Sequence, residues 1–239
     1  MKNPYQSKPV KILDIQDLNH NTKLFTLDIN FDFMPGQFVM AGLPGFGEAA
    51  FSLPAGNQLA IRKVGTVTKA LHQLKINDKI YLRGPYGQGW PIEIKNLKLK
   101  IKNYLIVAGG CGIISLRSIL SQENNIIFYG VKSKKDLLFK DEHKNWPNLH
   151  ISIEPKMVTD LFDKVKLPEN LTAFLCGPPI MYKFVIQKLR ELKIKNIYLS
   201  LERRMSCGIG VCQHCAIGDY YVCKDGPIFS LEQLKNQRF

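Results

Sequence analysis

Residues 104–112 are Tyr104-Leu105-Ile106-Val107-Ala108-Gly109-Gly110-Cys111-Gly112, a short apolar run that ends in a glycine-rich turn. Residues 113–121 follow with a helical pattern. A glycine turn between a strand and a helix suits a phosphate group, because a helix N-terminus presents free N–H groups and the positive end of its dipole. The turn lacks the G-x-G-x-x-G spacing, so a plain strand-to-helix connection is an equal alternative at this point.

The same alternation continues toward the C-terminus. Four more apolar runs of strand length lie at 125–130, 149–153, 172–176 and 196–200. Helical patterns separate several of them, at 158–165 and 178–193, and Pro178 suits the first turn of the second helix. Strand–helix alternation over about 100 residues predicts a parallel sheet with helices on both faces.

The N-terminal part has a different pattern, which predicts a small antiparallel barrel. Five extended runs, separated by Pro/Gly turns, lie at 10–18, 22–29, 37–42, 58–64 and 79–83. One or two helical turns at 66–74 interrupt them. We therefore expect three parts, which are a barrel domain at 1–98, an α/β domain at 99–200 and a C-terminal segment at 201–239.

Composition narrows the class of protein. The chain has 33 Lys and Arg against 20 Asp and Glu, a net charge of +13, which favours an anionic partner such as nucleotide phosphates, nucleic acid, an acidic subunit or a membrane surface. No run of about 18 apolar residues is present and the first residues do not resemble a secretory signal, so we expect no membrane insertion. We expect a cytoplasmic protein, in which the six cysteines stay reduced.

Four of the six cysteines follow the spacing Cys207-x4-Cys212-x2-Cys215-x7-Cys223. Plant-type [2Fe–2S] ferredoxins use C-x4-C-x2-C with a later fourth cysteine. The intervening glycines suit a loop whose backbone N–H groups point at sulfur. Zinc is the alternative, but structural zinc usually takes paired C-x2-C units and only Cys212 and Cys215 form one. The spacing therefore favours an iron–sulfur cluster.

Two segments of the barrel are further candidates for nucleotide contacts. Arg62 precedes Gly65-Thr66-Val67-Thr68, which opens the barrel's helix and predicts a second phosphate site. Gly84-Pro85-Tyr86-Gly87 ends a strand and equally suits a plain turn. Two nucleotide sites beside a one-electron cluster predict an electron relay. A flavin would connect its two ends, because it is the usual converter between hydride transfer and single-electron steps.

In these motifs the chain resembles the ferredoxin–NADP reductase-like flavoproteins, over about residues 8–232. More narrowly, it is similar to electron-transfer subunits with a C-terminal [2Fe–2S] cluster: the gamma subunits of hydrogenases and sulfhydrogenases, the corresponding subunit of anaerobic sulfite reductase, and the dihydroorotate dehydrogenase electron-transfer subunit. The x7 spacing before Cys223 and the following Asp225-Gly226-Pro227 are similar to the hydrogenase and sulfite reductase types. We rank the hydrogenase or sulfur-reductase type first, sulfite reductase second and dihydroorotate dehydrogenase third.

The resemblance implies an FAD site on the barrel. Ala49-Ala50-Phe51-Ser52 matches the segment that faces the flavin, with Phe51 along the ring, Ser52 near its reactive edge and Leu53 beside them. Ala49 replaces the usual arginine, which leaves the pyrophosphate to Arg62 and the turn Gly65–Thr68. Gly84–Gly87 matches the family's Gly-Pro-aromatic-Gly turn.

It also implies an NAD(P) site on the α/β domain. Ser115 replaces the proline that usually ends the glycine motif of the first βα turn. The implied nucleotide contacts are Gly109, Gly110 and Gly112 in that turn, Gly130 in the next strand, and Cys176, Gly177, Pro178 and Met181 in the C-G-P-P-x-M segment that faces the nicotinamide. Cys176 and Ser52 are the implied catalytic residues.

We therefore expect an NAD(P)H-dependent oxidoreductase subunit that moves electrons between NAD(P)H, FAD, the [2Fe–2S] cluster and a partner redox subunit. The other class left open is a flavin and iron–sulfur regulator that senses redox state without turnover. A nucleic-acid-binding module is disfavoured, because the lysines are dispersed and no aromatic–basic motif stands out.

The cysteine assignment gives a direct prediction. Replacing one ligand, as in Cys212→Ser or Cys223→Ser, removes one of four thiolates and should abolish the iron–sulfur visible absorption while the flavin bands stay. Absorption spectra of the anaerobically purified variants measure this. Unchanged cluster bands in either variant would contradict the assignment.

Overall fold

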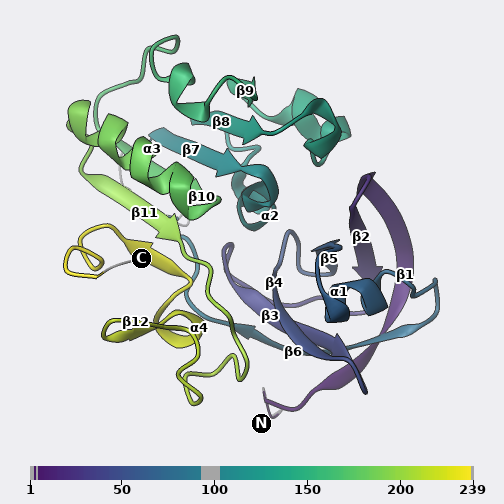
Figure 1. Ribbon diagram of the computed structural model, residues 1–239. Helices are drawn as coiled ribbons and strands as arrows, with labels where there is room; N and C mark the ends of the chain where they lie inside the picture. The colour runs from purple at the N-terminus through teal and green to yellow at the C-terminus, as the bar shows by residue number, and fades with distance from the viewer. Residues whose placement is uncertain (1–2, 4, 93–102, 238–239) are drawn as a thin grey trace. The chain divides into compact units, whose positions relative to one another are not determined.

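The computed structural model describes residues 3, 5–92 and 103–237 (Figure 1). The chain forms two compact units, Met1–Gly89 with Glu202–Pro227, and Trp90–Leu201 with Ile228–Phe239. The C-terminal segment expected at 201–239 is thus shared between the two units. The expected boundary between residues 98 and 99 lies outside the described residues.

The first unit is built on a six-stranded antiparallel sheet of order β4-β3-β6-β1-β2-β5. The two edge strands β4 and β5 contact each other, so the sheet curls into a barrel. The short helix α1 (Thr66–Leu71) lies against β3 and β4. The strands are β1 (Lys8–Asn19), β2 (Thr22–Leu27), β3 (Phe38–Leu43), β4 (Gly47–Ser52), β5 (Gln58–Arg62) and β6 (Lys79–Tyr86).

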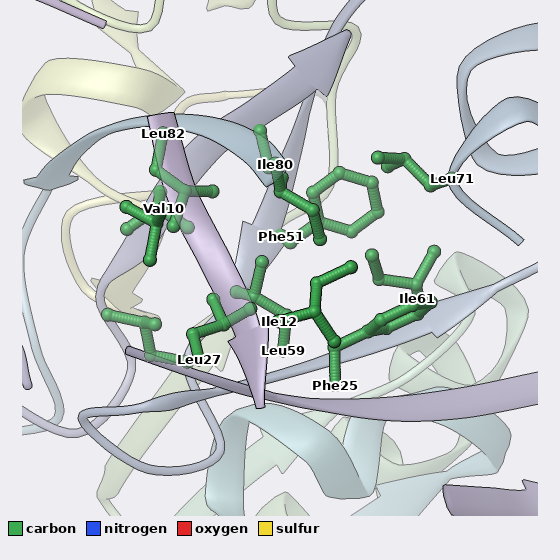
Figure 2. Close-up of a cluster of buried hydrophobic side chains, with 13 residues drawn as sticks. Val10, Ile12, Phe25, Leu27, Phe51, Leu59, Ile61, Leu71, Ile80 and Leu82 are labelled. Carbon is green, nitrogen blue, oxygen red and sulfur yellow. The ribbon is translucent and has the colours of Figure 1, made fainter. Parts of the chain in front are cut away.

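Alternating apolar residues of these strands fill the barrel (Figure 2). In β1, Val10 and Ile12 are buried while Lys11 between them is exposed, as expected for a strand with one face on a core. Figure 2 shows Phe25 and Ile61 from neighbouring strands in the same cluster. The barrel core therefore comes from all six strands of the sheet.

The second unit contains a six-stranded sheet of order β14-β11-β10-β7-β8-β9, parallel except for β14. Strand β10 is buried at all six positions, which explains why it is a continuous apolar run. The strands are β7 (Asn103–Gly109), β8 (Asn125–Val131), β9 (Leu149–Ile153), β10 (Leu171–Cys176), β11 (Asn196–Ser200) and β14 (Ile228–Ser230). The barrel and the parallel-sheet unit confirm the predicted fold class.

Two of the three helical patterns of this unit give shorter helices than predicted. The pattern at 113–121 gives only α2 (Ile113–Leu116) and a 3₁₀ turn, η2 (Arg117–Ile119). The pattern at 158–165 gives a 3₁₀ turn, η5 (Val158–Leu161). The long helix α3 (Pro179–Glu191) confirms the pattern at 178–193. Further 3₁₀ turns are η1 (Gly110–Gly112), η3 (Lys134–Asp136) and η4 (Lys140–Asn145).

The cysteine segment adds little regular structure to the first unit. A two-stranded hairpin joins β12 (Ala216–Ile217) to β13 (Tyr220–Tyr221), and the single turn α4 (Val222–Asp225) follows. Among the described residues, none of the helices has the length and apolar character that crossing a membrane requires.

The barrel core gives a stability prediction. Leu59 on β5 is fully buried, so Leu59→Ala should lower the free energy of unfolding by about 2–5 kcal/mol through lost burial and a residual cavity. Leu13→Ala on β1 is the matched control, because Leu13 is 46% exposed, and should change it by less than about 0.5 kcal/mol. Urea denaturation followed by circular dichroism measures both. Equal losses would show that Leu59 does not lie in a packed core.

Candidate cofactor sites

Three neighbouring strands of the first unit carry two of the predicted flavin segments. Phe38 on β3 pairs in register with Ser52 on β4 and, on its other side, with Tyr86 on β6. The segment that ends β4 and the predicted turn at Gly84–Gly87, whose first three residues are the end of β6, therefore flank β3. The predicted residues of β4 and its end are buried or half-buried, namely Phe51, Ser52 and Leu53.

Helix α1 brings the third predicted flavin segment against the same strands, since it contacts β3 and β4. The Thr68 hydroxyl accepts hydrogen bonds from the N–H groups of Val64 (2.9 Å) and Gly65 (2.8 Å). These two donors are therefore engaged by the protein's own side chain. Thr66 and Val67 form the first turn of the helix, and Arg62 is exposed at the end of β5.

The turn at Gly84–Gly87 is tied to the residues that follow the fourth cysteine. The Gln88 N–H donates to the Gly226 carbonyl at 2.6 Å, and Gln88 also forms a β-bridge with Pro227. At Gly87, where φ is 78°, an added Cβ would lie 2.5 Å from the Gly226 oxygen and 2.7 Å from Pro227 Cδ. Because only glycine permits this approach, Gly87 lets the turn pack directly on the cysteine segment.

Backbone N–H groups surround the sulfur atoms of the cysteine loop. Gly208 and Gly210 have φ values of 72° and 80°, which turn the chain around the cysteines. Five N–H groups donate to sulfur: Ile209, Val211 and Cys212 to Cys207 at 3.4, 3.3 and 3.4 Å, Gly210 to Cys223 at 3.0 Å, and Cys223 to Cys215 at 3.5 Å. Such bonds stabilise thiolates and tune the potential of an iron–sulfur cluster.

The four thiols are arranged as two pairs. Cys207 is hydrogen-bonded to Cys212, and Cys215 to Cys223. Within the described ranges, no three His, Cys, Asp or Glu side chains are grouped around the position of one metal ion. Two pairs fit a two-iron cluster, in which each iron takes two cysteines.

The surroundings of the two pairs differ electrostatically. Burial acts to raise the pKa of Cys207, but the N–H groups of the loop outweigh it and lower that pKa. The His214 N–H is the main group that lowers the pKa of Cys212, to about 7. Burial raises the pKa of Cys223 to about 12. Cys207 and Cys212 are therefore more readily deprotonated than Cys223.

The predicted nicotinamide residues lie at the carboxyl ends of neighbouring parallel strands in the second unit. Gly109 ends β7 and pairs with Gly130 on β8, and Cys176 ends β10 on the other side of β7. An added Cβ at Gly109 would lie 2.8 Å from both Met181 Sδ and Pro178 Cδ. The ends of β7 and β10 thus meet closely, as at the ligand-binding edge of a doubly wound sheet.

The glycine turn itself leaves open space beside this edge. At Gly110, where φ is 53°, an added Cβ would meet no atom within 4 Å. At Gly112 it would collide with the Cys176 backbone, and at Gly177 it would lie 2.7 Å from Met181 Cε and 3.0 Å from Gly109 Cα. The glycines therefore serve two purposes, close packing at two positions and a left-handed, open backbone at the third.

Ser115, which replaces the family's proline, makes a specific contact at this edge. Its hydroxyl donates to Cys176 Sγ at 3.3 Å, and its carbonyl accepts the Trp90 Nε1–H at 3.0 Å. The Tyr182 hydroxyl accepts the Gly177 N–H at 3.1 Å and bonds the Ser200 carbonyl. Cys176 and the turn after it are therefore held from two sides.

The predicted residues thus gather at three places, two in the first unit and one in the second, and their individual roles stay predictions. Sequence reasoning missed Arg83, whose side chain bonds the Cys207 carbonyl. Its position just before Gly84-Pro85 was the only local signal.

The packing of Gly208 gives a prediction about cluster assembly. An added Cβ there would lie 2.8 Å from Cγ of the fully buried Met40, so Gly208→Ala should destabilise the loop by about 1–3 kcal/mol and lower the iron content. Gly45→Ala is the control, because Gly45 has a similar φ of 81° but nothing within 4 Å. Iron per chain and visible absorption measure the effect. Equal iron contents in the two variants would contradict it.

Comparison with known proteins finds relatives that span nearly the whole chain. Sulfhydrogenase 2 subunit gamma from Pyrococcus furiosus is 38% identical, over 95% of this chain and 96% of the relative. A probable electron transfer subunit of dihydroorotate dehydrogenase B (NAD(+)) from Pyrococcus horikoshii is 34% identical, over 96% and 92%. Residues 202–235 match the family model of the iron–sulfur cluster binding domain of dihydroorotate dehydrogenase B.

Solved structures share the fold. An NADH-dependent reduced ferredoxin-NADP oxidoreductase aligns with a TM-score of 0.71 and 24% identity, over 93% of this chain and 88% of the other. The ferredoxin-NADP+ reductase from Plasmodium falciparum aligns with a TM-score of 0.67 and 21% identity, over 84% and 98%. Together with the relatives, these likenesses confirm the predicted resemblance. The chain belongs to the family of electron-transfer subunits that includes the sulfhydrogenase gamma subunits and the electron-transfer subunits of dihydroorotate dehydrogenase B.

Proposed function

We propose that the chain is the NAD(P)H-linked electron-transfer subunit of a hydrogenase or sulfur-reductase type complex. One observation carries the proposal. The turn Gly84–Gly87, which we assign to FAD, packs on the residues that follow the fourth cysteine of the [2Fe–2S] loop, within one compact unit. A flavin and a cluster bound at these places would lie on one rigid frame.

The protein's own work is to bind and orient the carriers. When bound, FAD and the cluster supply a two-electron and a one-electron carrier. We assign Cys176 and the glycine turn at 109–112 to the nicotinamide nucleotide, and Ser52 with Phe51 to the flavin ring. Hydride transfer requires close and oriented rings rather than an acid–base pair, so positioning by these residues is the catalytic contribution.

The type of complex follows from the relatives. The relative with 38% identity is the gamma subunit of a sulfhydrogenase, which supports a redox subunit as the macromolecular partner. The second candidate, electron transfer to a dihydroorotate dehydrogenase, is favoured by the family model at 202–235 and by the relatives at 34% identity. We further propose a cytoplasmic location, where the cysteine loop stays reduced until it takes up iron.

Anaerobic purification with visible spectroscopy and an NAD(P)H assay tests the proposal. We expect both flavin and [2Fe–2S] bands, and reduction of a viologen by NADH or NADPH. A co-purifying hydrogenase or sulfur-reductase subunit would support the first candidate, and a dihydroorotate dehydrogenase the second.

Two results would contradict the proposal. Colourless protein that contains only zinc would show that neither the flavin nor the [2Fe–2S] cluster is bound. Protein with flavin and cluster that NAD(P)H reduces, but that passes no electrons to viologen or ferricyanide, would indicate the redox-sensing regulator instead.

A further inference from the structure

We propose that Arg83 raises the reduction potential of the cluster held by the cysteine loop and positions its first ligand against the flavin turn. The inference rests on the proposed function and goes beyond it, because it assigns a tuning and positioning role to a side chain outside the ligand and flavin segments.

Hydrogen bonds hold the Arg83 side chain at three points. Its Nη1 donates to the Cys207 carbonyl at 2.7 Å. Its Nε and Nη2 donate to Glu48 Oε2 at 2.9 and 2.7 Å. The side chain is only 12% exposed and its guanidinium lies 5.6 Å from the centre of the Tyr86 ring. The guanidinium is therefore fixed in place, with its fork shared between strand β4 and the cysteine loop.

The backbone around Cys207 lies directly on the strands that carry this side chain. Arg83 on β6 pairs in register with Met40 on β3. Gly208 packs on Met40, and an added Cβ at Gly208 would lie 3.6 Å from Arg83 Nη1. Arg83 also immediately precedes Gly84, the first residue of the proposed flavin turn. One residue thus joins that turn to the backbone of the first cluster ligand.

The charge of Arg83 acts on the cluster in a predictable direction. Burial lowers its pKa and the bonds to Glu48 and Tyr86 raise it, with a net upward direction, so the guanidinium stays cationic. Each electron that moves from the flavin into the cluster adds one negative charge, which a nearby cation stabilises. Glu48 partly offsets this effect. Arg203 and Arg204 are exposed, so water screens them more strongly.

A redox titration of the holoprotein, followed by the EPR signal of the reduced cluster, tests the proposal. In Arg83→Gln the electron distribution between flavin and cluster should move about tenfold toward the flavin, because the cluster potential falls by about 59 mV. Glu48→Gln removes the offsetting negative charge and should move the cluster potential upward. Lys79→Gln, which removes an exposed charge from the same strand, is the control. It should change the electron distribution between flavin and cluster by less than about twofold.

The opposite signs separate tuning from simple loosening of the loop. A damaged loop would shift Arg83→Gln and Glu48→Gln in the same direction, and that result would overturn the proposal. Equal potentials in wild type and Arg83→Gln would also overturn it. If Arg83→Gln fails to assemble a cluster, Glu48→Gln and Arg83→Lys decide, since Arg83→Lys keeps the charge and should stay closer to wild type than to Arg83→Gln.

The titration also distinguishes this inference from the function on which it rests. A wild-type protein without a cluster signal would overturn the proposed function, and the role of Arg83 with it. If the wild-type protein holds a cluster but its potential is the same in Arg83→Gln and in Glu48→Gln, only the role of Arg83 is overturned.

Discussion

The packing of the cysteine loop on strand β6 and its turn is the constraint on which the rest of the first unit depends. At one end of the turn, Arg83 donates to the Cys207 carbonyl, and at the other Gln88 donates to the Gly226 carbonyl. Cys207 is therefore hydrogen-bonded to β6 itself, and Gly226, three residues after Cys223, to the residue Gln88 just beyond that strand. Because the barrel core fixes β6, it also fixes the loop, and the short loop needs little regular structure of its own.

We assign the nicotinamide nucleotide to the second unit, where the geometry would bring it close to the backbone. Gly109 at the end of β7 and Gly177 just after β10 lack side chains, which lets the ends of these two strands meet. Ser115 and Tyr182 then hold the Cys176 turn by hydrogen bonds. Rigid strands behind a close-packed glycine edge give an oriented site, which is what hydride transfer requires of a protein.

Local patterns predicted the longer strands and the cluster, but not the short strands β12, β13 and β14 or the long-range contacts. The cysteine spacing and the apolar runs are signals within 20 residues of sequence. The barrel, the parallel-sheet unit and the family could therefore be predicted from them. Strand β4 was missed because Gly47–Ser52 contains no β-branched residue. The bond from Arg83 to Cys207 spans 124 positions, and no local rule reaches that far. Helix length was also beyond these patterns, since 3₁₀ turns replace parts of two predicted helices.

The family's two-carrier chemistry and the packing of the cysteine loop on the Gly84–Gly87 segment imply that flavin and cluster are held close together in the first unit. EPR of half-reduced protein measures this most directly, through the magnetic interaction between a flavin radical and the reduced cluster. We expect a cluster signal that is split or relaxed by the flavin in the same chain. Two independent signals, each unchanged by the redox state of the other carrier, would contradict it.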